Sequence, residues 1–299
     1  MIFDFRLKVF HTVAHKLSFT KAATELFISQ PAVTKHIHEI EQQLGTALFK
    51  RNGNSIVLTS AGEILLQYSK KIFETYAALE AEMSQLNDVA GGNLRIGAST
   101  TIAQNILPRI LALFKKAYPN ISFSFVEGNT DSISLQVIAE KIDIALVEGN
   151  SHFPQLAYEP FAKDEIVLVT RSLSSLSKQP EITPQELLEI PLVLREQGSG
   201  TLDVVFKALN QVKINPKDLK VEAQFQNSSS IKQYLAHSET AAFLSIQSIL
   251  KELKYNELSI IEIQELDIFR TFQFIQLHGN ASKLIDLFKR FCKVHNLKL

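Results

Sequence analysis

The chain has 299 residues, 45% of them hydrophobic, which is enough for about two domains with cores of ordinary size. The 31 basic and 31 acidic residues cancel, so the overall charge does not indicate a nucleic-acid partner. The single cysteine, Cys292, excludes a disulfide within the chain and fits a reducing cytosol; its apolar helical surroundings favour a buried core thiol. No run of about 18 apolar residues and no signal-peptide pattern occurs, which predicts a cytoplasmic protein without a membrane span.

Residues 1–60 depart from this neutrality, with seven Lys and Arg against four Asp and Glu. A mild basic bias suits recognition of specific DNA sites better than general coating of DNA. Apolar spacing from Leu7 to Ala14 predicts a first helix, and Ser18 or Thr20 can cap a second one. The small side chains of Ala22 and Ala23 let another helix approach closely.

A third helix is predicted from Ser29, a natural N-cap, with Pro31 in the first turn and Gly45 as a left-handed C-cap. Its apolar positions leave a polar face that could contact base edges or phosphates. That face holds Gln30, Thr34, Lys35 and His38. For each of these taken alone, an ordinary solvated helix surface is about as good an explanation.

Lys50 to Asn54 contain an Asn-Gly pair between extended segments, which predicts a β-hairpin. The segment therefore predicts a winged helix-turn-helix with a basic wing. Lys50 and Arg51 are the basic residues of that wing, and Arg51 is the first choice for a contact to phosphate or to the minor groove.

Several motifs in these residues agree at their expected spacing with one known family. They are Phe19-Thr20-x-Ala22-Ala23, Ser29-Gln30-Pro31-Ala32-Val33, Ile37-x-x-Ile40-Glu41-x-x-Leu44-Gly45, Leu48-Phe49-x-Arg51 and Leu58-Thr59-x-Ala61-Gly62. The first 65 positions thus resemble the DNA-binding domain of bacterial LysR-type transcriptional regulators. The resemblance implies double-stranded DNA as a partner. The predicted DNA-binding residues are Thr20, Ser29, Gln30, Pro31, Thr34, Lys35, His38, Lys50 and Arg51.

Two residues differ from the family's pattern. Thr34 stands where Ser is most frequent, which keeps the hydroxyl, and Asn54 stands where a second basic wing residue is common. The second difference implies weaker binding of the wing to phosphate.

A long helix is predicted from Thr59 to about Asp88, with Ser60 and Glu63 at the spacing of a capping box. Its apolar stripe has coiled-coil spacing with one stutter near Ile72. The stripe consists of Ala61, Leu65, Tyr68, Ile72, Tyr76, Leu79, Met83 and Leu86. Packing on its own domain is the alternative to pairing with a second copy. The resemblance implies pairing, in a homodimer or homotetramer.

From Leu94 onward, strand and helix patterns alternate, which predicts a parallel α/β sheet. This part resembles the LysR effector-binding domain, whose two α/β lobes are like those of periplasmic-binding proteins. The expected organisation is a winged helix-turn-helix at 1–58, a linker helix at 59–90 and an effector-binding domain at 91–299. Within the last domain, lobe I spans about 91–162 and 268–299, and lobe II about 163–267.

Hydroxyl-rich segments follow the expected strands at Ser99–Thr101, Gly198–Thr201 and Asn227–Ser230. Free N–H groups at helix N-termini suit an anion, so we hypothesise a small anionic effector. Each segment alone is better explained as a simple N-cap. The predicted effector-binding residues are Ser99, Thr100, Thr101, Gly128, Glu148, Gly198, Ser199, Gly200, Thr201 and Ser228.

No motif for catalysis or for a cofactor occurs. His11 and His15 have zinc spacing without a third ligand, so neither a metal nor a cofactor is expected. The function predicted is a DNA-binding transcriptional regulator controlled by a small molecule, not an enzyme. The alternative is a solute-binding protein of the periplasmic type without a regulatory role.

Overall fold

The computed structural model describes residues 4–26, 28–52, 55–85, 91–149, 152–280 and 282–295. Its contacts divide the chain into two compact units, residues 1–88 with 291–299, and residues 89–290. Among the described residues, no helix combines the length and the apolar character needed to cross a membrane.

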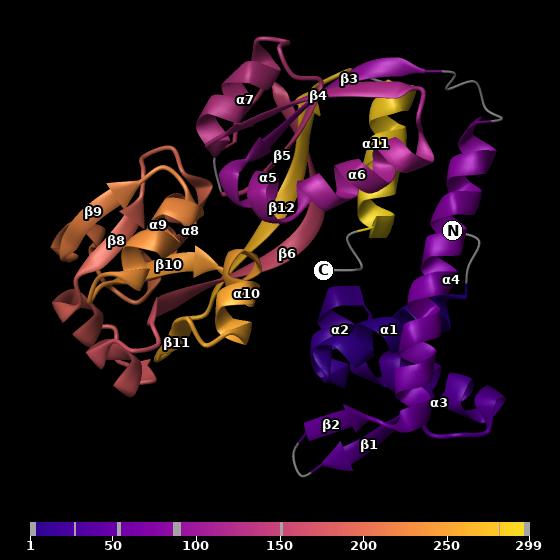
Figure 1. The fold of residues 1–299 in the computed structure, drawn as a ribbon, viewed down its shortest axis with the longest axis horizontal. Coiled ribbons are helices and arrows are strands. Elements are labelled where there is room, and N and C mark those ends of the chain that lie inside the picture. The colour runs from indigo at the N-terminus through magenta and orange to yellow at the C-terminus, as the bar shows by residue number, and fades with distance from the viewer. Residues whose placement is uncertain are drawn as a thin grey trace. The chain divides into compact units, whose positions relative to one another are not determined.

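The first unit is a winged helix-turn-helix followed by a long helix (Figure 1). Its elements are α1 (Phe5–Lys16), α2 (Phe19–Leu26), α3 (Gln30–Leu44), β1 (Phe49–Asn52), β2 (Ser55–Leu58) and α4 (Ser60–Gln85). The strands β1 and β2 pair antiparallel as the predicted wing, and the turn residues 53–54 lie outside the described residues. Phe10, Val13, Ala22, Val33 and Leu48 are among the buried side chains that join these elements in one core.

Local capping explains where the short helices begin and end. Of the two candidates for α2, Ser18 is the cap, because its Oγ accepts from the Lys21 N–H at 3.2 Å. Ser29 caps α3 by accepting from the Ala32 N–H at 3.3 Å. Gly45 ends α3 at φ 64°, a left-handed conformation that favours glycine. These contacts confirm the predicted limits of α3.

The predicted capping box at Ser60 and Glu63 is wrong by one residue. Thr59 is the cap of α4: its Oγ1 accepts from the Gly62 N–H at 3.1 Å and donates to the Ala47 carbonyl at 2.7 Å. Ser60 is already the first helical residue. Thr59 therefore joins the helix start to the loop that follows α3, which a local spacing rule does not reveal.

The stripe on α4 divides into two faces. Ala61 and Leu65 pack on the core of the first unit. Further along, Phe73 is buried against the ring of His11, with ring centroids 5.2 Å apart. On another side, Tyr68 and Ile72 are 53% and 37% exposed, although both belong to the predicted stripe. The alternative of packing on its own domain thus holds for the start of the helix, and a row of apolar side chains remains open to solvent beyond it.

The second unit is built on a ten-stranded sheet in the order β4-β3-β5-β12-β6-β10-β8-β9, in which β11 also pairs with β6 and β7 pairs with β11. The strands are β3 (Gly92–Ser99), β4 (Ile121–Gly128), β5 (Ile144–Val147), β6 (Leu156–Arg171), β7 (Glu181–Ile182), β8 (Leu192–Arg195), β9 (Val221–Phe225), β10 (Ala241–Ser245), β11 (Leu258–Ile263) and β12 (Ile268–Leu277). The helices are α5 (Thr100–Asn105), α6 (Leu107–Ala117), α7 (Thr130–Ile138), α8 (Gly200–Gln211), α9 (Ser228–Ala236), α10 (Ile246–Lys254) and α11 (Lys283–His295).

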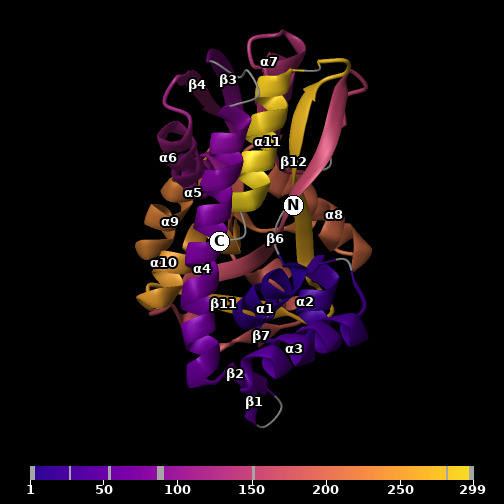
Figure 2. The same cartoon turned by 90° about the vertical axis from the view of Figure 1, so that its right-hand side faces the viewer.

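Two lobes arise because β6 and β12 are long and run antiparallel beside each other (Figures 1 and 2). The parallel strands β3, β4 and β5 form lobe I at one end of this pair. The strands β8 and β9 with β10 form the parallel part of lobe II at the other end. β6 passes through the expected lobe boundary at 162/163, so the chain crosses between lobes within a strand.

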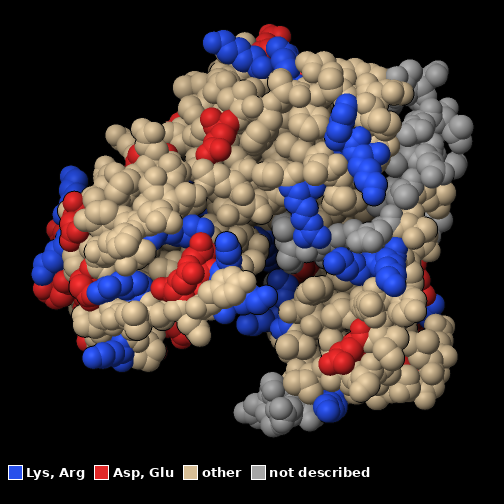
Figure 3. Space-filling model, in the orientation of Figure 1, with Lys and Arg blue, Asp and Glu red and all other residues tan. Residues whose placement is uncertain are grey.

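Helices cover both faces of the lobe II sheet, and alternate side chains of β10 show how. Ala241 and Phe243 belong to the core beneath α8, whereas Ala242 and Leu244 belong to the core beneath α9 and α10. In lobe I, Ile133 of α7 packs in one core with Ala145 of β5. On the face seen in Figure 3, basic and acidic side chains are interspersed around β8, β9 and β11, in keeping with the zero net charge.

Candidate functional site

The polar face predicted on α3 is solvent-exposed at Gln30, Thr34, Lys35 and His38. Gln30 and Thr34 bond each other: the Gln30 amide donates to Thr34 Oγ1 at 2.9 Å, and that hydroxyl donates to the Gln30 carbonyl at 3.2 Å. Residues one turn apart on a helix are neighbours, so these polar groups hold one another in place. Lys35 extends into solvent, with 77% of its side chain exposed.

A hollow of about 400 Å³ lies between α3 and the β1–β2 hairpin. The structure brings Gln30, Thr34 and His38 together with Lys50 around it. The other lining residues are Phe19, Ile37, Glu41, Phe49 and Ile56. Four predicted DNA-binding residues thus share one concave surface.

The remaining predicted residues of this surface have different places. Ser29 is the cap of α3, Pro31 is exposed in its first turn, and Thr20 is exposed in α2. The side chain of Arg51 lies outside the described residues. Sequence reasoning missed Glu41, whose Oε1 accepts from the Leu48 N–H at 2.7 Å and so links α3 to the start of the wing.

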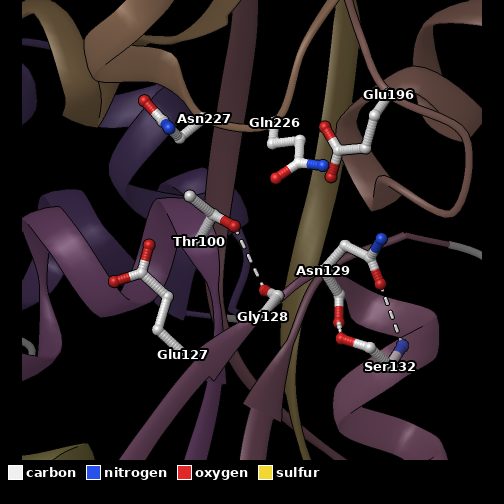
Figure 4. A pocket seen from close by; sticks show the side chains of 8 residues that line it. All are labelled: Thr100, Glu127, Gly128, Asn129, Ser132, Glu196, Gln226 and Asn227. Atoms are coloured by element: carbon white, nitrogen blue, oxygen red, sulfur yellow. Dashed lines mark hydrogen bonds between the residues drawn. The ribbon is translucent and has the colours of Figure 1, made fainter.

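In the second unit, a cavity of about 400 Å³ opens between the lobes (Figure 4). Its lining residues are Thr100, Glu127, Gly128, Asn129, Ser132, Glu196, Gln226 and Asn227. Thr100 and Gly128 are predicted site residues, and the Thr100 hydroxyl donates to the Gly128 carbonyl at 3.1 Å. Asn129 follows the predicted Gly128, Asn227 begins one of the hydroxyl-rich segments, and both cap helices. Sequence reasoning missed three lining residues, Glu127, Glu196 and Gln226. Each of them directly precedes or follows a predicted site segment or the end of a strand.

The two lobes also bond each other beside this cavity. The Ser229 hydroxyl of α9 donates to Gln104 of α5 at 3.1 Å. The Asp131 N–H at the start of α7 donates to the Gly198 carbonyl at 3.5 Å. The cavity is therefore bordered by weak polar contacts that a shift of the lobes would change.

Most of the other predicted effector residues are buried, and three of them, Thr101, Glu148 and Thr201, bond one another. The hydroxyls of Thr101 and Thr201 donate to the same carboxylate oxygen, Oε1 of Glu148, at 3.0 and 3.1 Å. Arg270 of β12 donates to Thr201 Oγ1 at 2.8 Å and lies 3.3 Å from the second oxygen of Glu148. A buried ion network thus joins α5, β5, α8 and β12.

The network continues from Arg270 to Asp164 of β6, whose carboxylate lies 2.7 Å from the guanidinium. The Ser245 hydroxyl donates to the same carboxylate at 2.7 Å. Burial raises the pKa of Asp164, and the ion pair with Arg270 and the hydrogen bond from Ser245 oppose that rise. The two crossing strands are therefore joined by a buried charge pair.

Gly200 and Gly149 are explained by close packing of the backbone. A Cβ on Gly200 would lie 2.2 Å from the carbonyl oxygen of Glu148, so only glycine fits there. Gly149 has φ 102° and would meet the Cα of Gly200 at 2.7 Å. Gly198, at φ 83°, is also left-handed. Ser99, Ser199 and Ser228 are buried at the starts of α5, α8 and α9.

Comparison with known proteins agrees with both units. Residues 5–63 match the model of the bacterial regulatory helix-turn-helix proteins of the lysR family, and residues 87–296 match the LysR substrate binding domain. The chain belongs to the LysR family. It is a DNA-binding transcriptional regulator with a domain for a small-molecule effector, and the alternative of a solute-binding protein without a regulatory role is not supported.

Relatives of this LysR-family regulator match over most of their length. The HTH-type transcriptional regulator CysL of Bacillus subtilis is 32% identical over 269 residues, covering 90% of this chain and 89% of that protein. A probable RuBisCO transcriptional regulator of Thalassiosira pseudonana is 32% identical over 289 residues, covering 95% and 94%. These relatives are transcriptional regulators by name, and none of these names denotes an enzyme.

Solved structures share the fold. The regulatory domain of Synechocystis CcmR in complex with 2-PG has a TM-score of 0.62 at 25% identity, covering 68% of this chain and 97% of that one. Full-length CbnR complexed with its target DNA has a TM-score of 0.57 at 18% identity, covering 99% and 100%. At 18% identity, the second likeness concerns the fold alone.

Proposed function

We propose that α3 and the β1–β2 hairpin bind a specific DNA site, and that a small molecule in the cavity between the lobes controls this binding. The observation that carries the proposal is the cavity itself, because residues of both lobes line it. A ligand that contacts both lobes has different affinities for different lobe arrangements, and it therefore shifts their populations.

On the DNA side, Gln30, Thr34 and His38 would face base edges, because they share the hollow beside the wing. Lys35, Lys50 and Arg51 would pair with phosphates. The start of α3 and the α2–α3 turn would lie against the backbone of the DNA, held there by Thr20, Ser29 and Pro31. The protein would act in the cytoplasm, where its DNA lies.

The exposed row on α4 supports pairing of two copies through that helix. Two copies related by a two-fold axis would place two α3 helices on a roughly palindromic site. Effector and DNA affinities would then be coupled reciprocally, because the same lobe and subunit arrangement affects both.

The chemical class of the effector has two opposing indications. The N-termini of four helices, α5, α7, α8 and α9, lie near the cavity or near the buried network of Thr101 and Glu148. Free N–H groups at helix N-termini favour an anion, which is the effector class that the sequence suggested. The carboxylates of Glu127 and Glu196 in the cavity wall favour a cationic group. A regulatory domain of 25% identity binds 2-PG, which supports a small-molecule ligand for this domain.

The DNA part is tested with the full-length protein on the DNA that flanks its own gene. A footprint with half-sites about one or more helical turns apart is expected. Lys35→Ala should weaken binding to all sequences alike and lower the salt dependence by about one unit. The matched control is Lys116→Ala on α6, an exposed lysine of the second unit, which should bind like the unchanged protein. A complete lack of protection with and without effectors would contradict the proposal.

The effector part is tested by Thr100→Ala. The change removes a hydroxyl from the cavity wall and should alter the effector concentration needed to change DNA binding, without altering the DNA affinity measured in its absence. Fluorescence anisotropy on a labelled site gives both values. An unchanged effector response would show that the cavity is not the effector site.

A further inference from the structure

We infer that the effector carries a protonated amino group, as an amine or an amino acid does, held between Glu127 and Glu196. The inference rests on the proposed effector role of the cavity and adds the charge of the ligand. Three features of the second unit support it: two of the hydroxyls predicted for an anion already bond a carboxylate of the protein, the cavity wall carries carboxylates, and these come from opposite lobes.

The first feature is that a carboxylate of the protein accepts from two of the hydroxyls predicted to bind an anion, those of Thr101 and Thr201. Both Thr101 and Thr201 donate to Glu148 Oε1, at 3.0 and 3.1 Å, and Arg270 lies 3.3 Å from Oε2. Glu148 is 2% exposed. An external anion bound to these two hydroxyls would have to displace this buried carboxylate, which would then lose its ion pair with Arg270. The network therefore disfavours an anion at these hydroxyls.

The second feature is the charge of the cavity wall. The eight lining residues include two glutamates and no Lys or Arg. Glu196 is paired with Arg195, at 2.9 Å, which lies buried behind it and also donates to the Gln226 carbonyl. In the described part of the protein, Glu127 has no cationic partner and accepts only from the neutral amide of Gln104, at 2.7 Å. One carboxylate charge at the cavity thus lacks a compensating cation in the described part of the protein.

The third feature is the position of the two carboxylates. Glu127 belongs to β4 of lobe I, and Glu196 follows β8 of lobe II. Figure 4 shows them on opposite sides of the cavity, with Thr100 and Asn129 between them. An ammonium group donates up to three hydrogen bonds and accepts none, so it suits these carboxylate acceptors, and a ligand that contacts both would bring the lobes together.

The other lining groups limit the rest of the ligand. Asn129, Gln226 and Asn227 offer amide groups, and Ser132 and Thr100 offer hydroxyls. These groups suit polar substituents rather than a hydrocarbon chain. The volume of about 400 Å³ is near the lower end for small-molecule sites, so the ligand is a small metabolite.

The inference is tested by thermal-shift and calorimetric titration of the full-length protein. The amine probes are putrescine, agmatine, L-ornithine and glycine, and the anion probes are sulfate, citrate and 2-phosphoglycolate. We expect at least one amine probe to bind. In Glu127→Gln and Glu196→Gln, which keep the side-chain shape, its affinity should fall about tenfold or more, as expected for the loss of a charge-assisted hydrogen bond.

Glu257→Gln is the control, because this exposed glutamate of lobe II lies outside the cavity lining and should leave ligand affinity unchanged. Binding of anions alone, binding of no amine probe, or amine binding that persists unchanged in both cavity variants would each overturn the inference. Amine binding that never alters DNA affinity would instead contradict the proposed function and leave the inferred ligand class standing.

Discussion

At the scale of single residues, the second unit depends on charges placed where water is excluded. Glu148, Asp164 and Arg270 are all at least 94% buried. Glu148 directly follows β5, Asp164 lies on β6 and Arg270 lies on β12. The two carboxylates share one guanidinium, and this cation offsets the free-energy cost of removing their charges from water. The same arrangement explains why hydroxyls that look like ligand donors in the sequence serve an internal group.

Arg270→Met should destabilise the protein by about 3–5 kcal/mol, because it leaves buried carboxylates without a cation. The loss should be larger at high pH, because burial raises the pKa of Asp164 and the variant lacks the ion pair that opposes this rise. Urea unfolding followed by circular dichroism at pH 6 and pH 8 measures both effects. The control Lys116→Met changes an exposed residue; equal stability of the two variants would contradict the role given to Arg270.

Glu239 offers a pH-dependent contribution at the surface. The Arg171 guanidinium, with donors from Ser174 and Ser175, lowers the pKa of Glu239 from 4.5 to about 2. Because the folded pKa is lowered, the contribution is present above pH 4.5 and is lost as pH falls towards 2. Urea midpoints of Glu239→Gln should therefore lie below those of the unchanged protein at pH 7 and approach them between pH 4.5 and 3. A constant difference over this range would contradict the assignment.

At the scale of elements, caps and turns decide where helices begin, and one of them depends on a distant loop. The Thr59 hydroxyl both caps α4 and donates to Ala47, twelve residues earlier. The α4 start, the loop after α3 and the wing are thereby fixed to one another. The direction of α4, the helix with the exposed apolar row, is thus fixed relative to the DNA-binding surface.

Thr59→Ala should cost about 1 kcal/mol of stability, the usual effect of losing an N-cap, or slightly more because the bond to Ala47 is also lost. Ser60→Ala is the matched control and should have little effect, since Ser60 is inside the helix and makes no described cap contact. Chemical denaturation of both variants compares them directly. A larger loss for Ser60→Ala would restore the capping box predicted from the sequence.

At the scale of the whole molecule, each unit presents a surface suited to a different partner. The first has the hollow beside the wing and the exposed row of Ile64, Tyr68, Ile72 and Leu79 on α4. The second has the cavity between the two lobes, which β6 and β12 connect. Exposed apolar side chains in a row are costly in water, and a second copy of the helix would cover them.

Ile72→Glu should shift the protein to smaller assemblies, because a charge would enter the apolar row between two copies. Multi-angle light scattering across a dilution series measures the change. Lys70→Glu, also an exposed position of α4 but on a different side of the helix, should keep the native assembly. An unchanged assembly in Ile72→Glu would show that the row does not pair subunits.

The sequence by itself determined the features that depend on neighbours along the chain. The limits of α3 follow from Ser29 and Gly45, the wing follows from Asn-Gly between strands, and the alternation of strands and helices follows from periodicity. Local backbone preferences and hydrophobic spacing act within a few residues, so they are legible without the fold. Thr100 and Gly128 were found in this way, because helix starts at strand ends carry hydroxyls and glycines.

Only the tertiary structure decided how distant residues use those groups. Glu148, Thr201 and Arg270 are separated by 53 and 69 positions in the chain, yet they share one buried network. Hydrogen bonds and ion pairs depend on distance in space and on burial, and neither is encoded in local spacing. For the same reason, the sequence placed donors for an anion near the cleft, and only the fold showed that a carboxylate of the protein is already bound to two of them, Thr101 and Thr201.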